Sequence, residues 1–323
     1  MKIFITGDRG FVGSYMTKKM VESGHEVIGL DKKTLDGKVY GYSVNEGNIL
    51  DKGILIKTMP GADCIIHLAA EHHDFGITRD EFFKVNVEGT KNLLDMASEL
   101  DIKTFIFYSS VAVYGDQDEP TTEETRPDPV SDYGKSKLKA EEEIRNWADE
   151  DKTRKVIMVR PAVIFGPCNY ANMYTLIDNI YRKRFIPVGK GNNIKSVAYV
   201  ENIVEATIFL LNKGLPGVSV FNYSDGPQKT SSQIMQIILK HMNRKTFRFH
   251  LPIWLAVSGA SIFDLLARIT RINFPITSYR IRKLNTATHH KAQKIKDLGF
   301  SPLISLEEGF RRMVAWYIKE DKH

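Results

Sequence analysis

Short apolar runs alternate with segments of helical period through the first half of the chain. Polar or glycine-containing turns bound each run, and each helical segment places apolar residues three or four positions apart. This alternation predicts a parallel, doubly wound sheet, an α/β fold. We expect strands at 3–5, 25–30, 64–68, 104–108 and 155–159, and helices at 11–20, 52–58, 79–99 and 132–150.

After Arg160-Pro161 the regular alternation of predicted strands and helices ends. Irregular stretches rich in Asn, Gly and Pro separate helices that we expect at 173–184, 202–212 and 231–242. Residues 1–165 are therefore interpreted as the sheet domain, and residues 166–323 mainly as a smaller lobe that faces the substrate. Late strands of the second part are expected to return to the main sheet, so no linker divides the two.

At 323 residues the chain is long enough to bury a sizeable core, as one large or two modest domains. The surplus behind its formal charge of +6 lies largely late in the sequence, from Arg268 onward. No basic run has interleaved aromatic residues, which argues against a nucleic-acid partner. Two interpretations of the basic surplus remain open, a solvated face and a surface for an anionic substrate or membrane.

We expect neither a signal peptide nor a metal site. Met1–Lys2 leads directly into the first strand, which predicts a cytoplasmic protein. Cys64 and Cys168 lie far apart and lack the spacing of metal ligands, so free thiols are expected. The histidines of His67–His73 are close in sequence, but no further ligand pattern completes a metal site.

The stretch Thr6–Gly13 carries the strongest chemical signal, because it joins a predicted strand to a predicted helix. Gly7 allows a tight turn, Gly10 lets the backbone approach a pyrophosphate, and Gly13 lets the helix pack closely on the strand. The amino end of the helix offers free N–H groups and the positive end of its dipole to phosphates. The spacing predicts a dinucleotide-binding turn.

Asp31 lies eighteen residues after Gly13, at the end of the second apolar run. A carboxylate at this place accepts hydrogen bonds from the adenosine ribose hydroxyls and repels a 2′-phosphate, which favours NAD over NADP. Lys32 and Lys33 follow it and would weaken that preference. We therefore expect NAD as the cofactor.

Tyr133 and Lys137 lie four residues apart on a predicted helix and share one face. A free phenol has a pKa of about 10, which is too high for a base near neutral pH. A neighbouring ammonium, together with the positive nicotinamide of oxidised cofactor, stabilises the phenolate. Ser110 follows the strand 104–108 at the edge of the sheet where ligands bind, so its hydroxyl can orient a substrate oxygen. These three residues are the predicted catalytic group.

With these motifs in place, the chain resembles the extended short-chain dehydrogenase/reductases nearly from end to end. The resemblance implies a Rossmann-type domain that binds NAD(P), a C-terminal substrate lobe, and a homodimer built on a four-helix bundle of helices 79–99 and 132–150. Four motifs carry the likeness, namely Thr6–Gly13 (T-G-x-x-G-x-x-G), His67–Ala70, Asn86–Thr90 (N-V-x-G-T) and Arg160–Pro167.

The resemblance also assigns residues to the cofactor and to the substrate. The residues implied for the cofactor are Gly7, Arg9, Gly10, Phe11, Val12, Gly13, Asp31, Lys32, Asn48, Ile49, Leu68, Ala69, Ala70, Asn86, Ser109, Tyr133, Lys137, Pro161 and Val163. Those implied for the substrate are Glu71, His72, Ser110, Val111, Asn172, Lys195 and Arg280.

Val111 and Ala112 argue against one branch of the family. Sugar 4,6-dehydratases carry acidic residues directly after the catalytic hydroxyl, because elimination of water needs a second acid and base. Sugar 4-epimerases often carry Ser or Thr at the position of Ala112, so the alanine departs from that branch as well.

Other stretches resemble the N-acetylhexosamine 4-epimerases, including the branch that interconverts N-acetylglucosamine and N-acetylgalactosamine on undecaprenyl diphosphate. These stretches are Glu71–Asp74, Ser109–Gly115 and Gly189–Glu205. Relatives that act on UDP-linked sugars look much alike. Lys195 stands where many nucleotide-sugar enzymes place an arginine for the diphosphate, and a lysine there leaves the carrier open.

The stretch Ile253–Arg271 predicts an amphipathic helix whose charged residues argue against a membrane span. Packing against the substrate lobe is one interpretation. The other is an interfacial helix whose apolar face touches lipid while Arg268 and Arg271 meet anionic headgroups. A lipid-carried substrate would give that helix a purpose at the inner face of the cell membrane.

We therefore expect an NAD-dependent 4-epimerase of GlcNAc and GalNAc on a diphosphate carrier, working through a 4-keto sugar in the synthesis of a cell-surface polysaccharide such as O-antigen. The carrier is undecaprenyl diphosphate or UDP. Two alternatives stay open. One is a 4-ketosugar reductase or 3β-hydroxysteroid-type dehydrogenase with net turnover of NAD(P)H, and the other is a nucleotide-sensing protein without turnover. The intact Ser110, Tyr133 and Lys137 argue against the second.

Overall fold

The computed structural model describes residues 1–34, 41–72, 76–247, 249–270 and 277–321, and for residues 262–270, 279, 280, 283 and 284 it describes the backbone alone. The chain forms two compact units. The first comprises residues 1–164, 200–224 and 290–303, and the second comprises residues 165–199, 225–289 and 304–323. The first unit is thus assembled from three separate stretches of the sequence.

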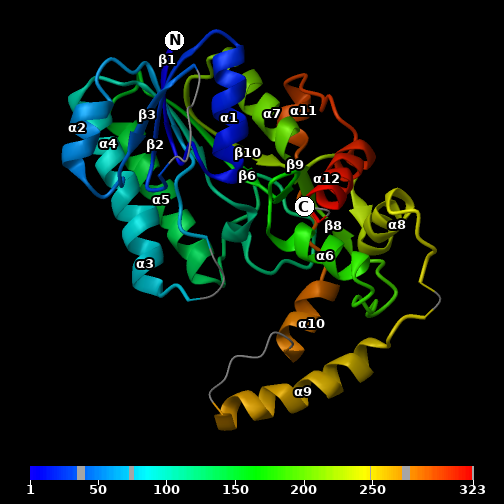
Figure 1. Cartoon of the computed structure of the whole chain (residues 1–323). Coiled ribbons are helices and arrows are strands. Elements are labelled where there is room, and N and C mark those ends of the chain that lie inside the picture. Colours follow the sequence, from blue (N-terminus) through cyan, green and yellow to red (C-terminus); the bar gives the residue numbers. More distant parts are fainter. Residues whose placement is uncertain (35–40, 73–75, 248, 271–276, 322–323) are drawn as a thin grey trace. The chain divides into compact units, whose positions relative to one another are not determined.

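A seven-stranded sheet forms the centre of the first unit in the part of the chain that the structure describes (Figure 1). Its order is β10-β6-β5-β4-β1-β2-β3, and all neighbouring strands are parallel. The predicted parallel α/β sheet is therefore confirmed. The strands are β1 (Lys2–Thr6), β2 (Glu26–Asp31), β3 (Ser43–Glu46), β4 (Cys64–His67), β5 (Thr104–Tyr108), β6 (Lys155–Pro161) and β10 (Gly217–Tyr223).

The central strands are buried on both faces, which is why their sequences are almost continuously apolar. Side chains alternate along a strand, so Ile3 and Ile5 of β1 face one layer of helices and Phe4 faces the other, all of them fully buried. Helices α1 (Phe11–Glu22) and α7 (Val200–Lys213) contact each other. Over the other face, α4 contacts both α2 and α5. These are α2 (Lys52–Thr58), α4 (Gly89–Glu99) and α5 (Asp132–Glu150).

The order of the strands reverses between β1 and β4. From β1 the chain continues to β2 and β3 on one side, and then crosses back to β4 on the other. In open α/β sheets, ligands bind outside the carboxyl ends of the strands at such a reversal. The glycine turn follows β1 and the segment 68–70 follows β4. The topology thus brings two predicted cofactor segments to one place.

The first unit also contains elements that differ from the expected ones. β3 has a polar sequence and lies at the edge of the sheet, where among the described strands it pairs with β2 alone. The expected helix at 79–99 is divided into α3 (Arg79–Phe83), a π-helical turn η1 (Lys84–Glu88) and α4. Such turns inside helices are frequent at functional sites. The remaining elements are η2 (Val111–Tyr114), β7 (Val163–Phe165) and α11 (Gln293–Asp297).

The second unit has its own aromatic core. Phe165 stacks on Phe310 with ring centroids 4.2 Å apart, and a Cβ at Gly309 would come within 2.8 Å of the Tyr199 ring. Glycine therefore lets α12 approach Tyr199 closely. The elements are α6 (Asn172–Tyr181), β8 (Ile194–Lys195), β9 (Val197–Tyr199), β11 (Lys229–Thr230), α8 (Ser231–His241), α9 (Ile253–Thr270), α10 (Ser278–Asn285) and α12 (Leu306–Glu320).

The predicted helix at 253–271 corresponds to α9. Arg271 lies outside the described residues, and the side chains of Asp264 and Arg268 are not described. Among the helices that the structure describes, none combines the length and the apolarity needed to cross a membrane.

Candidate functional site

The glycine turn places the amino end of α1 against the carboxyl ends of β1 and β4. Gly7 has a φ of +73°, and a Cβ at Gly13 would lie 1.9 Å from the Gly7 carbonyl oxygen, so only glycine permits this approach. In the described part of the chain no side chain caps the amino end of α1, which starts after Gly10. The first N–H groups of α1 are therefore free to donate to a bound pyrophosphate. The space at Gly10 fits such a group as well, because a Cβ there would meet only the Gly7 oxygen.

Asp31 ends β2 beside this turn and is almost fully buried. One carboxylate oxygen accepts a hydrogen bond from the Arg9 N–H (3.1 Å), and the other accepts one from the Lys33 N–H (3.0 Å). The Arg9 guanidinium donates to the carbonyl oxygens of Asp31 and Asn45. Arg9 is thereby held by the backbone, and the acceptor capacity that remains on Asp31 fits ribose hydroxyls better than a phosphate.

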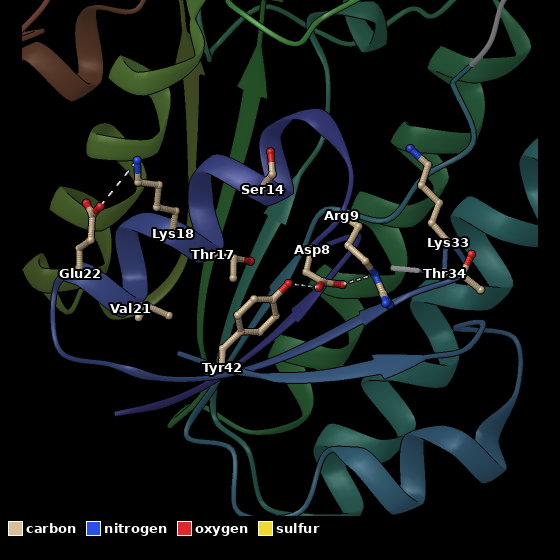
Figure 2. A pocket seen from close by; sticks show the side chains of 10 residues that line it. All are labelled: Asp8, Arg9, Ser14, Thr17, Lys18, Val21, Glu22, Lys33, Thr34 and Tyr42. Atoms are coloured by element: carbon tan, nitrogen blue, oxygen red, sulfur yellow. Dashed lines mark hydrogen bonds and ion pairs between the residues drawn. The ribbon is translucent and has the colours of Figure 1, made fainter. Parts of the chain in front are cut away.

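A hollow of about 630 Å³ lies next to the glycine turn, and Figure 2 shows the side chains that line it. At its base, the Tyr42 hydroxyl donates to Asp8 (2.9 Å), and the Arg9 guanidinium lies 3.6 Å from the same carboxylate. Burial raises the pKa of Asp8 above its ordinary value. Arg9 is the predicted site residue that lines this hollow, and Ser110, Tyr133 and Lys137 do not line it. The hollow is therefore separate from the predicted catalytic group.

A chain of buried hydrogen bonds runs from the glycine turn to α5 through His67. The Thr90 hydroxyl donates to the Asn86 carbonyl (2.7 Å) and must therefore accept from Nε2 of His67 (3.0 Å). Nδ1 of His67 is then free to accept from the Thr6 hydroxyl (2.7 Å). Burial and the nearby Lys137 lower the pKa of His67 well below its ordinary value, so the imidazole is neutral.

Asn86, in the π-helical turn, continues this chain to α5. Its side-chain oxygen accepts from the Glu71 N–H (2.8 Å), and its amide donates to the Glu71 carbonyl (3.0 Å) and the Ser136 hydroxyl (2.9 Å). Ser136 in turn donates to the Tyr133 carbonyl (2.8 Å). Both amide hydrogens of Asn86 are directed at protein groups, and its predicted contact with the cofactor stays a prediction.

The structure brings the three predicted catalytic residues to neighbouring elements. Ser110 caps η2 by accepting from the Ala112 N–H (3.1 Å). A Cβ at Gly134 in α5 would lie 2.5 Å from the Ala112 carbonyl oxygen, so α5 packs directly on η2. Tyr133, in the first turn of α5, is half-buried, with its ring 6.1 Å from that of Phe82.

Lys137 lies one turn further along α5 and is fully buried. Its ammonium nitrogen is 4.2 Å from the centre of the Phe107 ring. Burial lowers the pKa of Lys137 to about 7, and the charge of Glu141 opposes that shift. A positive charge at this place is therefore lost as the pH rises through neutrality, unless a negative charge forms beside it.

A buried ion pair supports this region, and the sequence analysis missed it. Arg160 of β6 donates to both carboxylate oxygens of Glu141 in α5, at 2.8 and 2.5 Å. The Ser109 hydroxyl donates to the same carboxylate (2.5 Å), and the third guanidinium nitrogen of Arg160 donates to the Tyr114 hydroxyl (2.9 Å). The available signal was that Glu141 falls one further turn beyond Lys137, on the same helix face.

The other predicted residues of the first unit lie along the same edge of the sheet or in its core. Asn48 follows β3 and is exposed, whereas Ile49 is buried and contacts Gly89. His72 is exposed. Their predicted roles, and those of the remaining residues, stay predictions. Of these, Phe11 and Val12 begin α1, Lys32 follows β2 and pairs with Glu71, Leu68, Ala69 and Ala70 follow β4, Val111 begins η2, Pro161 ends β6, and Val163 begins β7.

Three predicted substrate residues belong to the second unit. Asn172 is the first residue of α6 and is exposed. The Lys195 ammonium, in β8, donates to the Thr286 carbonyl (2.7 Å). Arg280 lies in α10, and its side chain is outside the described part of the structure. The roles of these three residues also stay predictions.

Within the described residues, no group of three or more His, Cys, Asp or Glu side chains is arranged to hold a metal ion. His73 of the histidine stretch lies outside them. His67 has both ring nitrogens engaged by threonine hydroxyls. These hydrogen bonds, rather than a metal, account for its burial.

Comparison with known proteins matches residues 3–223 to the NAD-dependent epimerase/dehydratase family. A relative from Escherichia coli O157:H7, the N-acetyl-α-D-glucosaminyl-diphospho-ditrans,octacis-undecaprenol 4-epimerase, is 34% identical over 97% of this chain and 94% of its own. The Thermotoga maritima UDP-glucose 4-epimerase, solved with UDP-glucose, has a similar fold (TM-score 0.78, 24% identity, 99% of each chain covered). So has the Bacillus anthracis dTDP-glucose 4,6-dehydratase solved with NAD (TM-score 0.76, 23% identity, 100% and 98% covered).

The role of Asp31 is tested by Asp31→Asn, which keeps the shape of the side chain and removes its charge. We expect the Kd for NAD to rise about tenfold, because ribose hydroxyls lose a charged acceptor. The relative affinity for NADP should rise, because repulsion of the 2′-phosphate is lost. Calorimetric titration of cofactor-free protein measures both. Asp63→Asn, which changes an exposed carboxylate, is the matched control, and an unaltered NAD affinity in Asp31→Asn would contradict the assignment.

The buried ion pair is tested by Glu141→Gln. The substitution leaves the Arg160 guanidinium buried without its counter-charge, and we expect it to cost about 3–5 kcal/mol of unfolding free energy. Chemical denaturation measures this loss. Glu142→Gln, at the exposed neighbouring position, should change stability by less than about 0.5 kcal/mol. Equal effects at the two positions would show that the pair does not stabilise the fold.

Proposed function

Because the chain belongs to the NAD-dependent epimerase/dehydratase family and uses NAD, we propose that it is a sugar 4-epimerase. Its substrate is an N-acetylhexosamine linked to a carrier through a diphosphate, and it interconverts the GlcNAc and GalNAc forms. The relative from E. coli O157:H7, which is similar over nearly the whole chain, supports this proposal.

The observation that carries the proposal is the composition of η2 where it packs on α5. Ser110, Tyr133 and Lys137 supply one hydroxyl, one acid–base group and one amine. Directly after Ser110 come Val111 and Ala112, which cannot transfer protons. A site with one acid–base residue suits removal and return of hydrogen at a single carbon, whereas elimination of water needs a second acid and base.

In the proposed reaction, Tyr133 acts first as base and then as acid. Its phenolate takes the proton of the C4 hydroxyl, and Ser110 holds the C4 oxygen by a hydrogen bond as a carbonyl forms there. Bound NAD would supply the hydride acceptor and donor for C4, so that hydrogen can return to the opposite face of the 4-keto sugar. Tyr133 then gives its proton back to the oxygen, so that neither protons nor electrons are consumed. Lys137 stabilises the phenolate and holds the nicotinamide ribose.

The residues of the glycine turn would hold the pyrophosphate of NAD, and Asp31 its adenosine ribose. Asn172 and Lys195 are proposed to contact the sugar or the diphosphate, with Arg280 as a further candidate. A lysine gives the diphosphate a positive charge without the bidentate geometry of an arginine. These residues are compatible with both carriers.

We favour undecaprenyl diphosphate as the carrier, in the synthesis of a cell-surface polysaccharide such as O-antigen. The 34% identity to an enzyme of that specificity supports this choice. A lipid-linked substrate requires access to a membrane, which the helix α9 is proposed to provide. We further propose a homodimer that packs helices 79–99 and 132–150 of two copies into a four-helix bundle.

The reaction is tested by incubating the purified protein separately with UDP-GlcNAc and with GlcNAc-diphosphoundecaprenol. We expect the GalNAc form to appear from the lipid-linked sugar, without added NAD and without a net absorbance change at the nicotinamide band. Chromatography of the released sugars and a steady-state absorbance trace measure the two quantities. Conversion of the UDP sugar alone would contradict the carrier, and stoichiometric formation or loss of NADH would indicate a reductase or dehydrogenase instead.

Tyr133→Phe tests the proposed acid–base residue. We expect kcat to fall about 10²- to 10⁴-fold, because the phenyl ring cannot take the C4 proton. NAD content should stay unchanged, since the ring itself is kept. Tyr181→Phe, on α6, is the control and should retain activity. A Tyr133→Phe protein with ordinary turnover would exclude the proposed chemistry, and unchanged cellular function would favour a non-catalytic role.

A further inference from the structure

Two neighbouring segments of the second unit expose large apolar side chains. Ile186 is 66% exposed, Phe249 is 86% exposed, and Trp254 is 69% exposed. Ile253 and Leu255, which stand with Trp254 in the first turn of α9, are exposed as well. Scattered apolar residues on a protein surface need no explanation, whereas exposed apolar residues that lie side by side are typical of a binding surface.

Backbone hydrogen bonds hold the two segments together. The Leu251 N–H donates to the Pro187 carbonyl (2.8 Å), and the Gly189 N–H donates to the Leu251 carbonyl (2.9 Å). Val188 and Leu251 form a parallel bridge. The segments are thus fixed side by side by bonds that do not depend on the exposed side chains.

The register of this bridge places Ile186 and Phe249 on one surface, and the Ile253 side chain lies against Gly189 at the end of the first segment. Two residues before the bridge, Ile186 stands beside Phe249, on the same side of the paired segments because side chains alternate along extended chain. Below them, Phe185 packs against Phe247 with ring centroids 5.6 Å apart. We name residues 182–190, 244–247 and 249–255 together the basic-apolar surface.

The charges of this surface are all positive. Residues 182–190, 244–247 and 249–255 contain no Asp or Glu, and they contain six Lys or Arg. Lys183, Lys190 and Lys245 are exposed, and within the described residues none of the three forms an ion pair. By contrast, Arg182 pairs with Asp178 and Asp321 outside these segments.

We propose that the basic-apolar surface docks on an anionic lipid bilayer. Exposed Trp and Phe side chains enter the interface between headgroups and acyl chains, and lysine ammonium groups around them meet lipid phosphates. A second copy of this chain fits less well, because a symmetric contact would oppose like charges on the two copies. The charge pattern therefore favours lipid over self-association.

This inference extends the membrane access proposed for a lipid-linked substrate, but it rests on residues outside the catalytic group. Vesicle binding can be measured without substrate or turnover. If the proposed chemistry failed its test, the inference that this surface docks on lipid would still stand. If the surface did not bind lipid, the protein could still epimerise a soluble UDP sugar.

The test is cosedimentation of the full-length protein with vesicles of phosphatidylcholine, with or without phosphatidylglycerol. We expect binding to the anionic vesicles that weakens as salt is raised, and little binding to the neutral ones. A variant that carries Lys183→Gln, Lys190→Gln and Lys245→Gln together should have a partition coefficient roughly a hundredfold lower than the parent protein. Each lysine near an anionic surface raises the partition coefficient about fivefold, so three lysines together account for this change. The matched control neutralises three exposed lysines elsewhere, Lys57, Lys155 and Lys296, and should bind nearly as the parent does.

The apolar part is tested by Ile186→Ser, Phe249→Ser and Trp254→Ser in one protein, with Ile56→Ser and Leu303→Ser as the control. We expect the vesicle partition coefficient of the first variant to fall at least tenfold, while the midpoint of its unfolding transition stays unchanged. A blue shift of tryptophan emission on adding anionic vesicles should disappear in Trp254→Phe.

Three results would overturn the proposal. The first is no binding of the parent protein to anionic vesicles. The second is equal binding of the surface variants and their controls. The third is a concentration-dependent dimer that the same substitutions abolish while vesicle binding persists, because the surface would then join two copies of the chain.

Discussion

The arrangement of the site depends on one uncharged histidine. His67 accepts a hydrogen bond from Thr6 at the end of β1 and donates one to Thr90 in α4, and this direction is set by the bond from Thr90 to the Asn86 carbonyl. Through Asn86 and Ser136 the same chain reaches the first turn of α5. The glycine turn and the helix that carries Tyr133 are therefore positioned by one continuous, fully buried set of polar groups, which is rigid because every member is satisfied.

Burial also changes the pKa of Lys137. Removing an amine from water disfavours its charged form, and here the pKa falls to about 7. The ammonium becomes favourable again when a negative charge forms beside it, which is the role proposed for the Tyr133 phenolate.

Much of the sheet and the glycine turn could be predicted from the sequence, because central parallel strands are apolar on both faces and the glycine spacing has a steric cause. The bounds of α2, β5 and α5 agree with the expected ranges. β3 could not be found in this way, since its Ser43–Glu46 is polar and an edge strand is held mostly by its neighbour's backbone. The π-helical turn was also missed, because it does not alter the apolar period enough to be visible.

Of the candidate site, the sequence indicated which residues share a helix face but not what they contact. Glu141 reads as one more charged residue in a charged helix, and its burial becomes evident only when β6 brings Arg160 to it. Similarly, the sequence places Ile49 in a loop after β3, and its burial in the core beside Gly89 becomes evident only in the structure. Long-range contacts of this kind depend on the packing of elements distant in sequence.

The return of β10 to the sheet has a consequence for biosynthesis. β10 covers the edge of β6, yet about 60 residues separate the ends of the two strands, so the ribosome completes β6 well before its partner exists. At roughly 5–20 residues per second, that edge stays open for several seconds. An uncovered parallel edge offers unpaired N–H and C=O groups to other nascent chains. We therefore expect the yield of folded protein to depend on translation speed as well as on the final energy of the sheet.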